Sequence, residues 1–180
     1  FFEANYLRGR KPRAFDLLYW NSDSTRLPAA MLLWYLKEVY LENRLRQPGG
    51  LEMNGVKIDL SKIETPVFVL ATSEDHIAPW TSIYPATQIL GGEVEFVLGG
   101  SGHIAGVINP PTERAKYGFR KSDTYPPEPA NFLTKATEMP GSWWPYWAHW
   151  LEAKDGKTVK PRKPVNRGKY KSIEPAPGSY

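Results

Sequence analysis

Two short apolar runs give the clearest pattern in the chain, VFVLA at positions 67–71 and VEFVL at positions 94–98. Runs of this length and composition predict strands that are buried on both faces of a parallel sheet. The segment between them, WTSIYPATQIL, predicts a short helix with a kink at Pro85. A strand, a helix and a strand in this order predict a right-handed crossover between parallel strands. The loops after both strands should therefore leave the same edge of the sheet, where open α/β sheets bind their ligands.

The first 50 residues combine a helical period with many aromatic side chains. Pro28 can occupy the first turn of a helix, and apolar positions at helical spacing continue from it to Leu45. This helix should end before the segment Pro48-Gly49-Gly50. Downstream, the pair Asn54-Gly55 predicts a tight hairpin turn between two short strands.

The region after the second apolar run is less regular. Residues 110–130 are rich in Pro, Lys and Asp and predict a loop, whereas NFLTKATEM at 131–139 predicts a modest helix. Ser142 can cap a further helix, WWPYWAHWLEAK, in which Pro145 falls within the first turns. The tryptophans of that helix are typical of core packing or of cover for a sheet edge, and less often of a carbohydrate-binding platform.

Composition and charge narrow the class of protein further. Apolar residues make up 41% of the 180 residues, enough for a sizeable core, and no apolar run approaches the length of a membrane span. The absence of cysteine excludes disulfides, thiolate metal sites and a thiol nucleophile within these residues. The net charge of +4 comes from residues 151–180, which carry eight Lys or Arg and three acidic residues. Such a tail is more often a solvated arm than a nucleic-acid contact, so we expect no nucleic-acid partner.

An acid and a histidine follow the two predicted strands. Asp75 comes after the first, and His103 comes 28 positions later, in the glycine-rich stretch GGSGHIAGVINPP. In α/β-hydrolases the triad acid and histidine occupy loops after late strands, in the chain order nucleophile, acid, histidine. Glycines permit the backbone that the histidine needs, and Pro110-Pro111 restricts the loop beyond it. We interpret Asp75 and His103 as a catalytic pair. The alternative is an acid that caps the helix at Trp80 and a surface histidine.

The pair requires a nucleophile, and this chain offers no good candidate. Ser101 lies two residues before His103, but the elbow pattern G-x-S-x-G would require Gly at position 103. Since the chain begins with Phe rather than Met and carries no secretory leader pattern, we expect it to start inside a longer protein. The nucleophile should then lie upstream of residue 1. The other histidines, His76 and His149, show no metal-ligand spacing, so we expect no metal site.

Several motifs resemble those of one enzyme family. SEDHIAPW, GGSGHIAGVINPP, GSWWPYWAHWL and the ending YKSIEPAPGSY are similar to the C-terminal part of polyhydroxyalkanoate synthases, in particular the short-chain, class I type. FDLLYWNSDSTRLPAAM resembles the cap region of that family, so the resemblance covers essentially the whole chain. It implies the C-terminal portion of an α/β-hydrolase fold, with the nucleophile-bearing half outside this chain. The implied parts are a cap at 1–60, a core at 61–111, C-terminal helices at 112–155 and an extended tail at 156–180.

The resemblance also implies a function. Enzymes of this family polymerise 3-hydroxyacyl-CoA, such as 3-hydroxybutyryl-CoA, into polyester and release CoA, which is a product rather than a cofactor. In a Cys-His-Asp triad, His103 would be the base that generates the cysteine thiolate, and Asp75 would be its partner. The side chains that would line the substrate pocket are Ser101, Ile104, Ala105 and Trp20. The implied partners are the acyl-CoA, the growing polyester, the upstream part of the same protein, a second copy of the chain and the surface of a cytoplasmic polyester granule.

Two other functions are compatible with the residues. An esterase or thioesterase of the α/β-hydrolase fold would use water where the synthase uses a hydroxyl, and its elbow would read G-x-S-x-G rather than G-x-C-x-G. A non-catalytic module is the second alternative, in which the N-terminal and tryptophan-rich helices mediate dimerisation or granule association. Because the chain lacks a nucleophile elbow, we expect it to be inactive in isolation.

Overall fold

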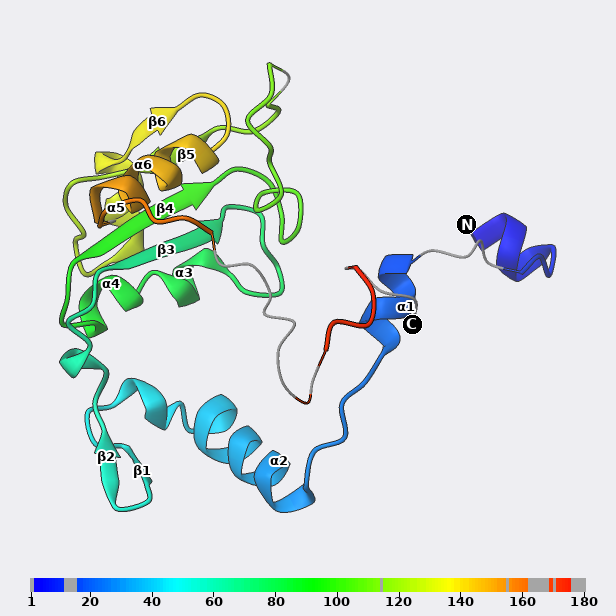
Figure 1. The fold of residues 1–180 in the computed structure, drawn as a ribbon, viewed down its shortest axis with the longest axis horizontal. Helices are drawn as coiled ribbons and strands as arrows, with labels where there is room; N and C mark the ends of the chain where they lie inside the picture. The colour runs from blue at the N-terminus through cyan, green and yellow to red at the C-terminus, as the bar shows by residue number, and fades with distance from the viewer. Residues whose placement is uncertain are drawn as a thin grey trace. The chain divides into compact units, whose positions relative to one another are not determined.

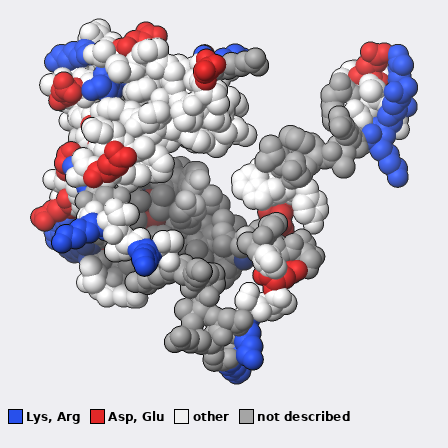
Figure 2. Space-filling model, turned by 45° about the horizontal axis from the view of Figure 1, so that its top comes forward, with Lys and Arg blue, Asp and Glu red and all other residues white. Residues whose placement is uncertain are grey.

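A computed structural model describes most of the chain. The described residues are 2–11, 16–113, 115–154, 156–161, 169 and 171–175. The chain divides into two compact units, Phe1–Val67 with Ala86–Val94 and Phe68–Pro85 with Glu95–Tyr180. In the described part, no helix combines the length and the apolar character needed to cross a membrane. Figure 2 shows acidic and basic side chains interspersed on the face that it draws, rather than gathered by sign.

The first unit consists of short helices and one hairpin (Figure 1). Its helices are η1 (Phe2–Leu7), α1 (Asp16–Ser22), α2 (Ala29–Tyr35), η2 (Leu36–Leu41), η3 (Arg44–Arg46), η4 (Leu60–Lys62) and α4 (Ala86–Ile89). Strands β1 (Leu51–Met53) and β2 (Val56–Ile58) pair antiparallel. Asn54 and Gly55 between them have φ values of 50° and 79°, both positive, as a tight hairpin turn requires. The predicted hairpin is confirmed.

The helix predicted after Pro28 is shorter than its apolar pattern. Pro28 is the N-cap of α2, and its carbonyl accepts a hydrogen bond from the N–H of Leu32. The helix α2 continues into the π-helix η2, which ends at Leu41, so the prediction that helical order extends to Leu45 is wrong. Asn43 adopts a φ of 49°, and this left-handed conformation turns the chain out of the helix. Leu45 lies instead in the single 3-10 turn of η3.

A four-stranded sheet in the order β3-β4-β5-β6 lies at the centre of the second unit (Figure 1). Its strands are β3 (Val67–Thr72), β4 (Val94–Gly99), β5 (Phe119–Lys121) and β6 (Thr137–Met139), and the helices are α3 (Trp80–Ile83), α5 (Pro129–Lys135) and α6 (Trp144–Lys154). The N–H of Val67 donates to the carbonyl of Glu93, and the N–H of Ser73 donates to that of Gly99. Because the offset is the same at both ends, β3 and β4 run parallel, as predicted. Pro85 separates α3 from α4, which confirms the predicted interruption.

The remaining two strands of the sheet are absent from the sequence prediction. β5 pairs antiparallel with β4 and with β6, where Phe119 lies opposite Met139. Residues 110–130 therefore contain a strand, and the prediction of a loop throughout is wrong. The helix predicted at 131–139 ends at Lys135 as α5, and the chain returns as β6. The sheet is mixed, and the fold of this unit belongs to the α/β class.

Aromatic side chains cover both faces of the sheet. On one face, Tyr84 from the end of α3 and Phe132 of α5 pack against Phe96 of β4, with ring centroids 5.1–5.4 Å apart. All three rings are fully buried. On the opposite face, Phe68 of β3 contacts Trp150 of α6 at 5.5 Å between ring centroids. The aromatic side chains of the tryptophan-rich helix therefore pack on a face of the sheet, which is the core-packing role expected from its sequence rather than cover of a sheet edge.

Candidate active site

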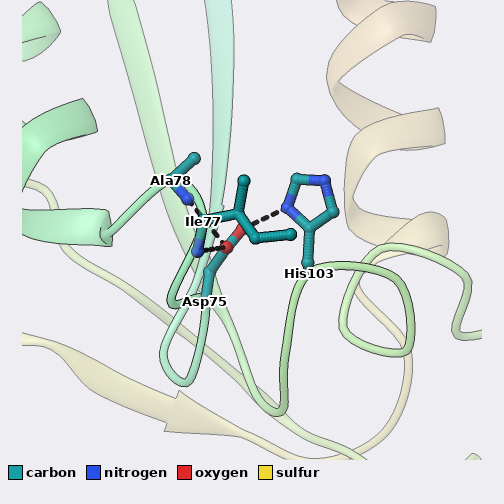
Figure 3. A network of polar contacts seen from close by, with 4 residues as sticks. All are labelled: Asp75, Ile77, Ala78 and His103. Atoms are coloured by element: carbon teal, nitrogen blue, oxygen red, sulfur yellow. Dashed lines mark hydrogen bonds and ion pairs between the residues drawn. The ribbon is translucent and has the colours of Figure 1, made fainter.

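The loop after β3 holds the carboxylate of Asp75 in a fixed orientation (Figure 3). Its Oδ1 accepts hydrogen bonds from the backbone N–H groups of Ile77 and Ala78, each at 2.9 Å. This turn forms because a short carboxylate side chain reaches N–H groups two and three residues further along the chain. The helix α3 begins at Trp80 with Pro79 as its N-cap, so Asp75 does not cap that helix. Its second oxygen, Oδ2, points toward the loop after β4 (Figure 3).

His103 lies in that second loop and contacts Asp75. Its Nδ1 is 2.7 Å from Oδ2 of Asp75 (Figure 3). The imidazole is 46% exposed and the carboxylate side chain 7% exposed, so solvent and other molecules have access to the ring rather than to the acid. The N–H of Ala78 first, and then His103 and Ile77, lower the pKa of Asp75 to about 2, although desolvation opposes them. Asp75 is therefore ionised at neutral pH and can stabilise a protonated imidazole.

Backbone hydrogen bonds connect the two loops beyond the ends of the strands. The N–H of Ser73 donates to the carbonyl of Gly99, and the N–H of Glu74 donates to that of Ser101, both at 2.9 Å. Ser101 has a φ of 70°, a left-handed conformation that is uncommon for serine. The chain turns sharply there and brings His103 toward the acid. The first bond continues the pairing of β3 with β4, and the second joins the two loops directly, so the loops are fixed relative to one another.

A helical turn carries His103 and packs closely against the end of β3. The N–H of Gly106 donates to the carbonyl of Gly102 at 2.9 Å. A Cβ atom added to Gly106 would lie 2.4 Å from Cγ2 of Thr72 and 2.5 Å from the carbonyl oxygen of Gly100. Glycine is required at position 106 for this close approach, and its φ is not in the left-handed region.

Side-chain hydrogen bonds hold the far end of this turn. The indole Nε1 groups of Trp143 and Trp144 donate to the carbonyls of Gly106 at 3.2 Å and Val107 at 3.0 Å. The amide of Asn109, which is buried, donates to a backbone carbonyl in the segment before β5 at 2.8 Å. Sequence reasoning missed these contacts. A tryptophan-rich helix indicates packing, but the partners of its N–H groups depend on where the helix docks.

The residues predicted to line the pocket have different surroundings. Ile104 and Ala105 are exposed on the turn beside His103. Ser101 is half-buried and borders a cavity of about 260 Å³. Trp20 is an exposed residue of α1 in the first unit, so its role in the pocket stays a prediction.

The cavity beside Ser101 has a largely polar lining. The lining residues are Ser73, Glu74, Leu98, Gly99, Gly100, Ser101, Lys116, Tyr117, Gly118, Phe119, Arg120 and Glu138. The hydroxyl of Ser101, followed by Lys116, lowers the pKa of Tyr117. The cavity adjoins the histidine loop without including the imidazole of His103.

The other two histidines occupy exposed positions. His76 follows the acid directly in the loop after β3. His149 lies on the outer surface of α6, with its Nδ1 3.8 Å from a carboxylate oxygen of Glu152. Within the described ranges, no group of three or more His, Asp or Glu side chains is arranged to hold a metal ion.

The geometry of the pair suits general acid–base chemistry. A carboxylate at Nδ1 favours the tautomer that carries its proton there, which leaves Nε2 able to accept or donate a proton. The same carboxylate stabilises the imidazolium that forms when Nε2 is protonated. The sequence contains no cysteine, and Ser101, whose hydroxyl lowers the pKa of Tyr117, does not fit the G-x-S-x-G elbow. Asp75 and His103 thus have the geometry of a base and its partner, without an activated nucleophile of their own.

Comparison with protein-family models gave no match, but the chain is similar to several curated proteins. It is 50% identical over 176 residues to a poly(3-hydroxyalkanoate) polymerase of Methylorubrum extorquens. The matched region covers 98% of the chain and 29% of that polymerase. It is 47% identical over 178 residues to the poly(3-hydroxyalkanoate) polymerase subunit PhaC of Cupriavidus necator, with coverage of 98% and 30%. For the corresponding subunit of Rhizobium etli, the identity is 47% over 180 residues, with coverage of 100% and 28%. The chain thus spans less than a third of the length of these relatives. The resemblance noted in the sequence is confirmed, and the chain belongs to the poly(3-hydroxyalkanoate) polymerase family.

Proposed function

We propose that this chain supplies the histidine and the acid of a Cys-His-Asp triad in an α/β-hydrolase-fold enzyme that polymerises 3-hydroxyacyl-CoA. The observation that carries the proposal is the 2.7 Å contact between Nδ1 of His103 and Oδ2 of Asp75. The similarity to polymerases over 98% of the chain supports the choice of reaction. The cysteine belongs to the part of the protein outside these residues, because the sequence contains none.

In the first half of the proposed reaction, Nε2 of His103 takes the proton of the cysteine thiol. Asp75 stabilises the resulting imidazolium. The thiolate attacks the carbonyl carbon of the acyl-CoA thioester, and the carbon–sulfur bond to CoA breaks as the new thioester forms. The imidazolium returns its proton to the departing CoA thiolate, so CoA leaves as the free thiol.

In the second half, His103 acts as the base for chain growth. Its Nε2 removes the proton of a 3-hydroxyl group, whose oxygen then attacks the enzyme-bound acyl group. An ester bond forms, the bond to the cysteine sulfur breaks, and the proton returns to that sulfur. Exclusion of water from the pocket favours transfer to the hydroxyl over hydrolysis. CoA is a product of this scheme, and no cofactor takes part.

The proposal extends to the surroundings of the pair. Residues 1–60 act as a cap over the pocket, and Ser101, Ile104, Ala105 and Trp20 contribute to its lining. Short-chain substrates such as 3-hydroxybutyryl-CoA fit the small side chains at positions 101 and 105. The enzyme acts as a homodimer in the cytoplasm, at the surface of the polyester granule that it produces.

The test is release of CoA from 3-hydroxybutyryl-CoA by the full-length protein that contains this chain. We expect CoA release with insoluble polyester, and loss of both in His103→Gln and Asp75→Asn. His149→Gln is the matched control, because this histidine pairs only loosely with Glu152 on the surface. CoA release with free hydroxy acid and no polymer would identify a thioesterase. Full activity in His103→Gln would contradict the assigned base, and no CoA release by the parent protein would favour a non-catalytic module.

A further inference from the structure

The turn that carries His103 ends at the carbonyl groups of Gly106 and Val107. The turn is closed by the bonds from Gly106 N–H to the Gly102 carbonyl and from Ile108 N–H to the Ile104 carbonyl. The chain then leaves toward Pro110 without a further helical turn. Among the described residues, the N–H of Asn109 is the backbone donor to the Val107 carbonyl, at 3.1 Å, and the Gly106 carbonyl has no backbone donor. The last carbonyl groups of a helical segment need partners from elsewhere.

Trp143, just before α6, and Trp144, its first residue, supply side-chain donors to these carbonyls. Trp143 Nε1 donates to the Gly106 carbonyl, and Trp144 Nε1 donates to the Val107 carbonyl, at 3.2 Å and 3.0 Å. The ring of Trp143 is itself held by Phe68 of β3, with stacked centroids 6.1 Å apart. The indoles therefore attach the outer end of the histidine turn to the rigid layer formed by the sheet and α6.

This attachment affects the contact between His103 and Asp75, because the two side chains are held in place by different parts of the chain. Asp75 is oriented by its own loop, through the N–H groups of Ile77 and Ala78. His103 depends on the position of its turn, which the indoles reach at Gly106, three residues further along. A displacement of the turn changes the distance from Nδ1 to Oδ2 without moving the acid.

We propose that Trp143 and Trp144 are positioning residues for His103, acting through their indole N–H groups on the carbonyls of Gly106 and Val107. Neither indole needs to touch substrate in this role. The activity part of the test rests on the function proposed above, whereas the geometric part does not.

The test replaces each indole N–H and keeps the ring. In the full-length protein, Trp143 and Trp144 are replaced singly and together by 3-benzothienylalanine, which has sulfur in place of the N–H and nearly the same shape. Trp150 is the matched control on the same helix. Its Nε1 is buried and makes no hydrogen bond in the described part of the chain. The same replacement at Trp150 therefore removes an indole N–H without removing a hydrogen bond.

Three measurements distinguish positioning from general stability. The first is the downfield proton resonance of His103 Nδ1, assigned by its loss in His103→Gln. The second is kcat and KM for CoA release from 3-hydroxybutyryl-CoA, and the third is the midpoint of thermal unfolding. For each of Trp143 and Trp144 we expect an upfield shift or broadening of the resonance and a kcat about fivefold lower, with KM nearly unchanged. Fivefold corresponds to about 1 kcal/mol, the usual net contribution of one hydrogen bond. The Trp150 analogue should match the parent in resonance and kinetics, and its thermal midpoint should be no lower than the parent's, because the replacement removes a buried N–H that has no partner among the described residues.

The outcomes separate this inference from the proposed function. If the Trp143 and Trp144 analogues match the Trp150 analogue in resonance and kcat, the positioning role is refuted while the polymerase function stands. If they lose only thermal stability, with resonance and kcat unchanged, the role is likewise refuted. If the parent protein releases no CoA but its resonance responds to the two replacements, the proposed function fails and the positioning of the imidazole is supported.

Discussion

Alanine at position 106 tests whether close packing on β3 places the histidine turn. The added Cβ would meet Cγ2 of Thr72 at 2.4 Å, whereas ordinary contacts begin at about 3.4 Å, so the turn must move by about 1 Å. The obstacle at 2.5 Å is the backbone oxygen of Gly100, which cannot rotate away. A shift of that size away from Asp75 would stretch the 2.7 Å contact with His103 beyond hydrogen-bonding range. Overpacking of this kind costs about 1–3 kcal/mol of unfolding free energy, and a misplacement of about 1 Å can lower the rate about 100-fold.

The matched control lies in the same loop. A Cβ added to Gly102 would have only the carbonyl oxygen of Glu74 nearby, at 3.6 Å, and Gly102 also lacks a left-handed φ. In the full-length protein we therefore expect Gly102→Ala to retain most of its CoA release and stability. Gly106→Ala should lose both, measured as CoA release and as the urea midpoint of unfolding. Equal behaviour of the two variants would refute the reasoning.

A second-site change addresses the case in which Gly106→Ala folds poorly. Thr72→Ser removes the Cγ2 atom that the new Cβ would strike and keeps the hydroxyl. Added to Gly106→Ala, it should restore part of the stability, and only part, because the clashes with the oxygen of Gly100 at 2.5 Å and with Cβ of residue 72 at 2.9 Å remain. No recovery at all would show that contact with Cγ2 of Thr72 does not limit the turn.

Three further predictions concern ionisation and hydrogen bonding in the second unit. Burial raises the pKa of Tyr125 to about 12. Between pH of about 10 and about 12 the native state keeps a proton that the unfolded chain loses, so the unfolding free energy should fall as pH rises through this range. Tyr125→Phe should flatten this pH dependence in urea titrations, and an unchanged slope would contradict the prediction. The N–H of Ala78 is the main cause that lowers the pKa of Asp75 to about 2. The ionised carboxylate therefore adds to the unfolding free energy above a pH of about 4, and this contribution is lost as the pH falls toward 2. The unfolding free energy of Asp75→Asn should lack this dependence on acid. The Tyr146 hydroxyl donates to a carboxylate oxygen of Glu95 at 2.7 Å, so Tyr146→Phe should lower the unfolding free energy by about 1–3 kcal/mol, and an unaltered urea midpoint would count against this bond.

The sequence predicts those parts of the fold whose signal is local. The apolar runs of β3 and β4 and the Asn54-Gly55 turn each carry their pattern within a few residues. β5 and β6 are three residues each and read FRK and TEM, with charged residues among them. Their pairing depends on Phe119 meeting Met139 across the sheet, a contact between distant segments that leaves no periodic trace in the sequence. Short strands of this kind need tertiary pairing to exist.

The sequence predicts the candidate site to a similar extent. The proximity of Asp75 and His103 follows from a general rule, that the loops after parallel strands leave the same edge of a sheet. The supports of His103 do not follow from any such rule. Thr72 reads only as the end of a strand, and Trp143 and Trp144 read only as packing residues. What they contact depends on the docking of α6 and on the close approach that Gly106 permits, which are properties of the assembled fold.

The turn around His103 also has a practical consequence for protein engineering. Two of its residues, Gly106 and Val107, are fixed by the sheet and the indoles, whereas the side chains of Ile104 and Ala105 are exposed. Two exposed positions are therefore followed directly by two fixed positions within one short segment next to the imidazole. A combinatorial library that randomises positions 104 and 105 can reshape the surroundings of the imidazole while its backbone stays in place. The same library extended to position 106 would consist mostly of misfolded or misaligned variants.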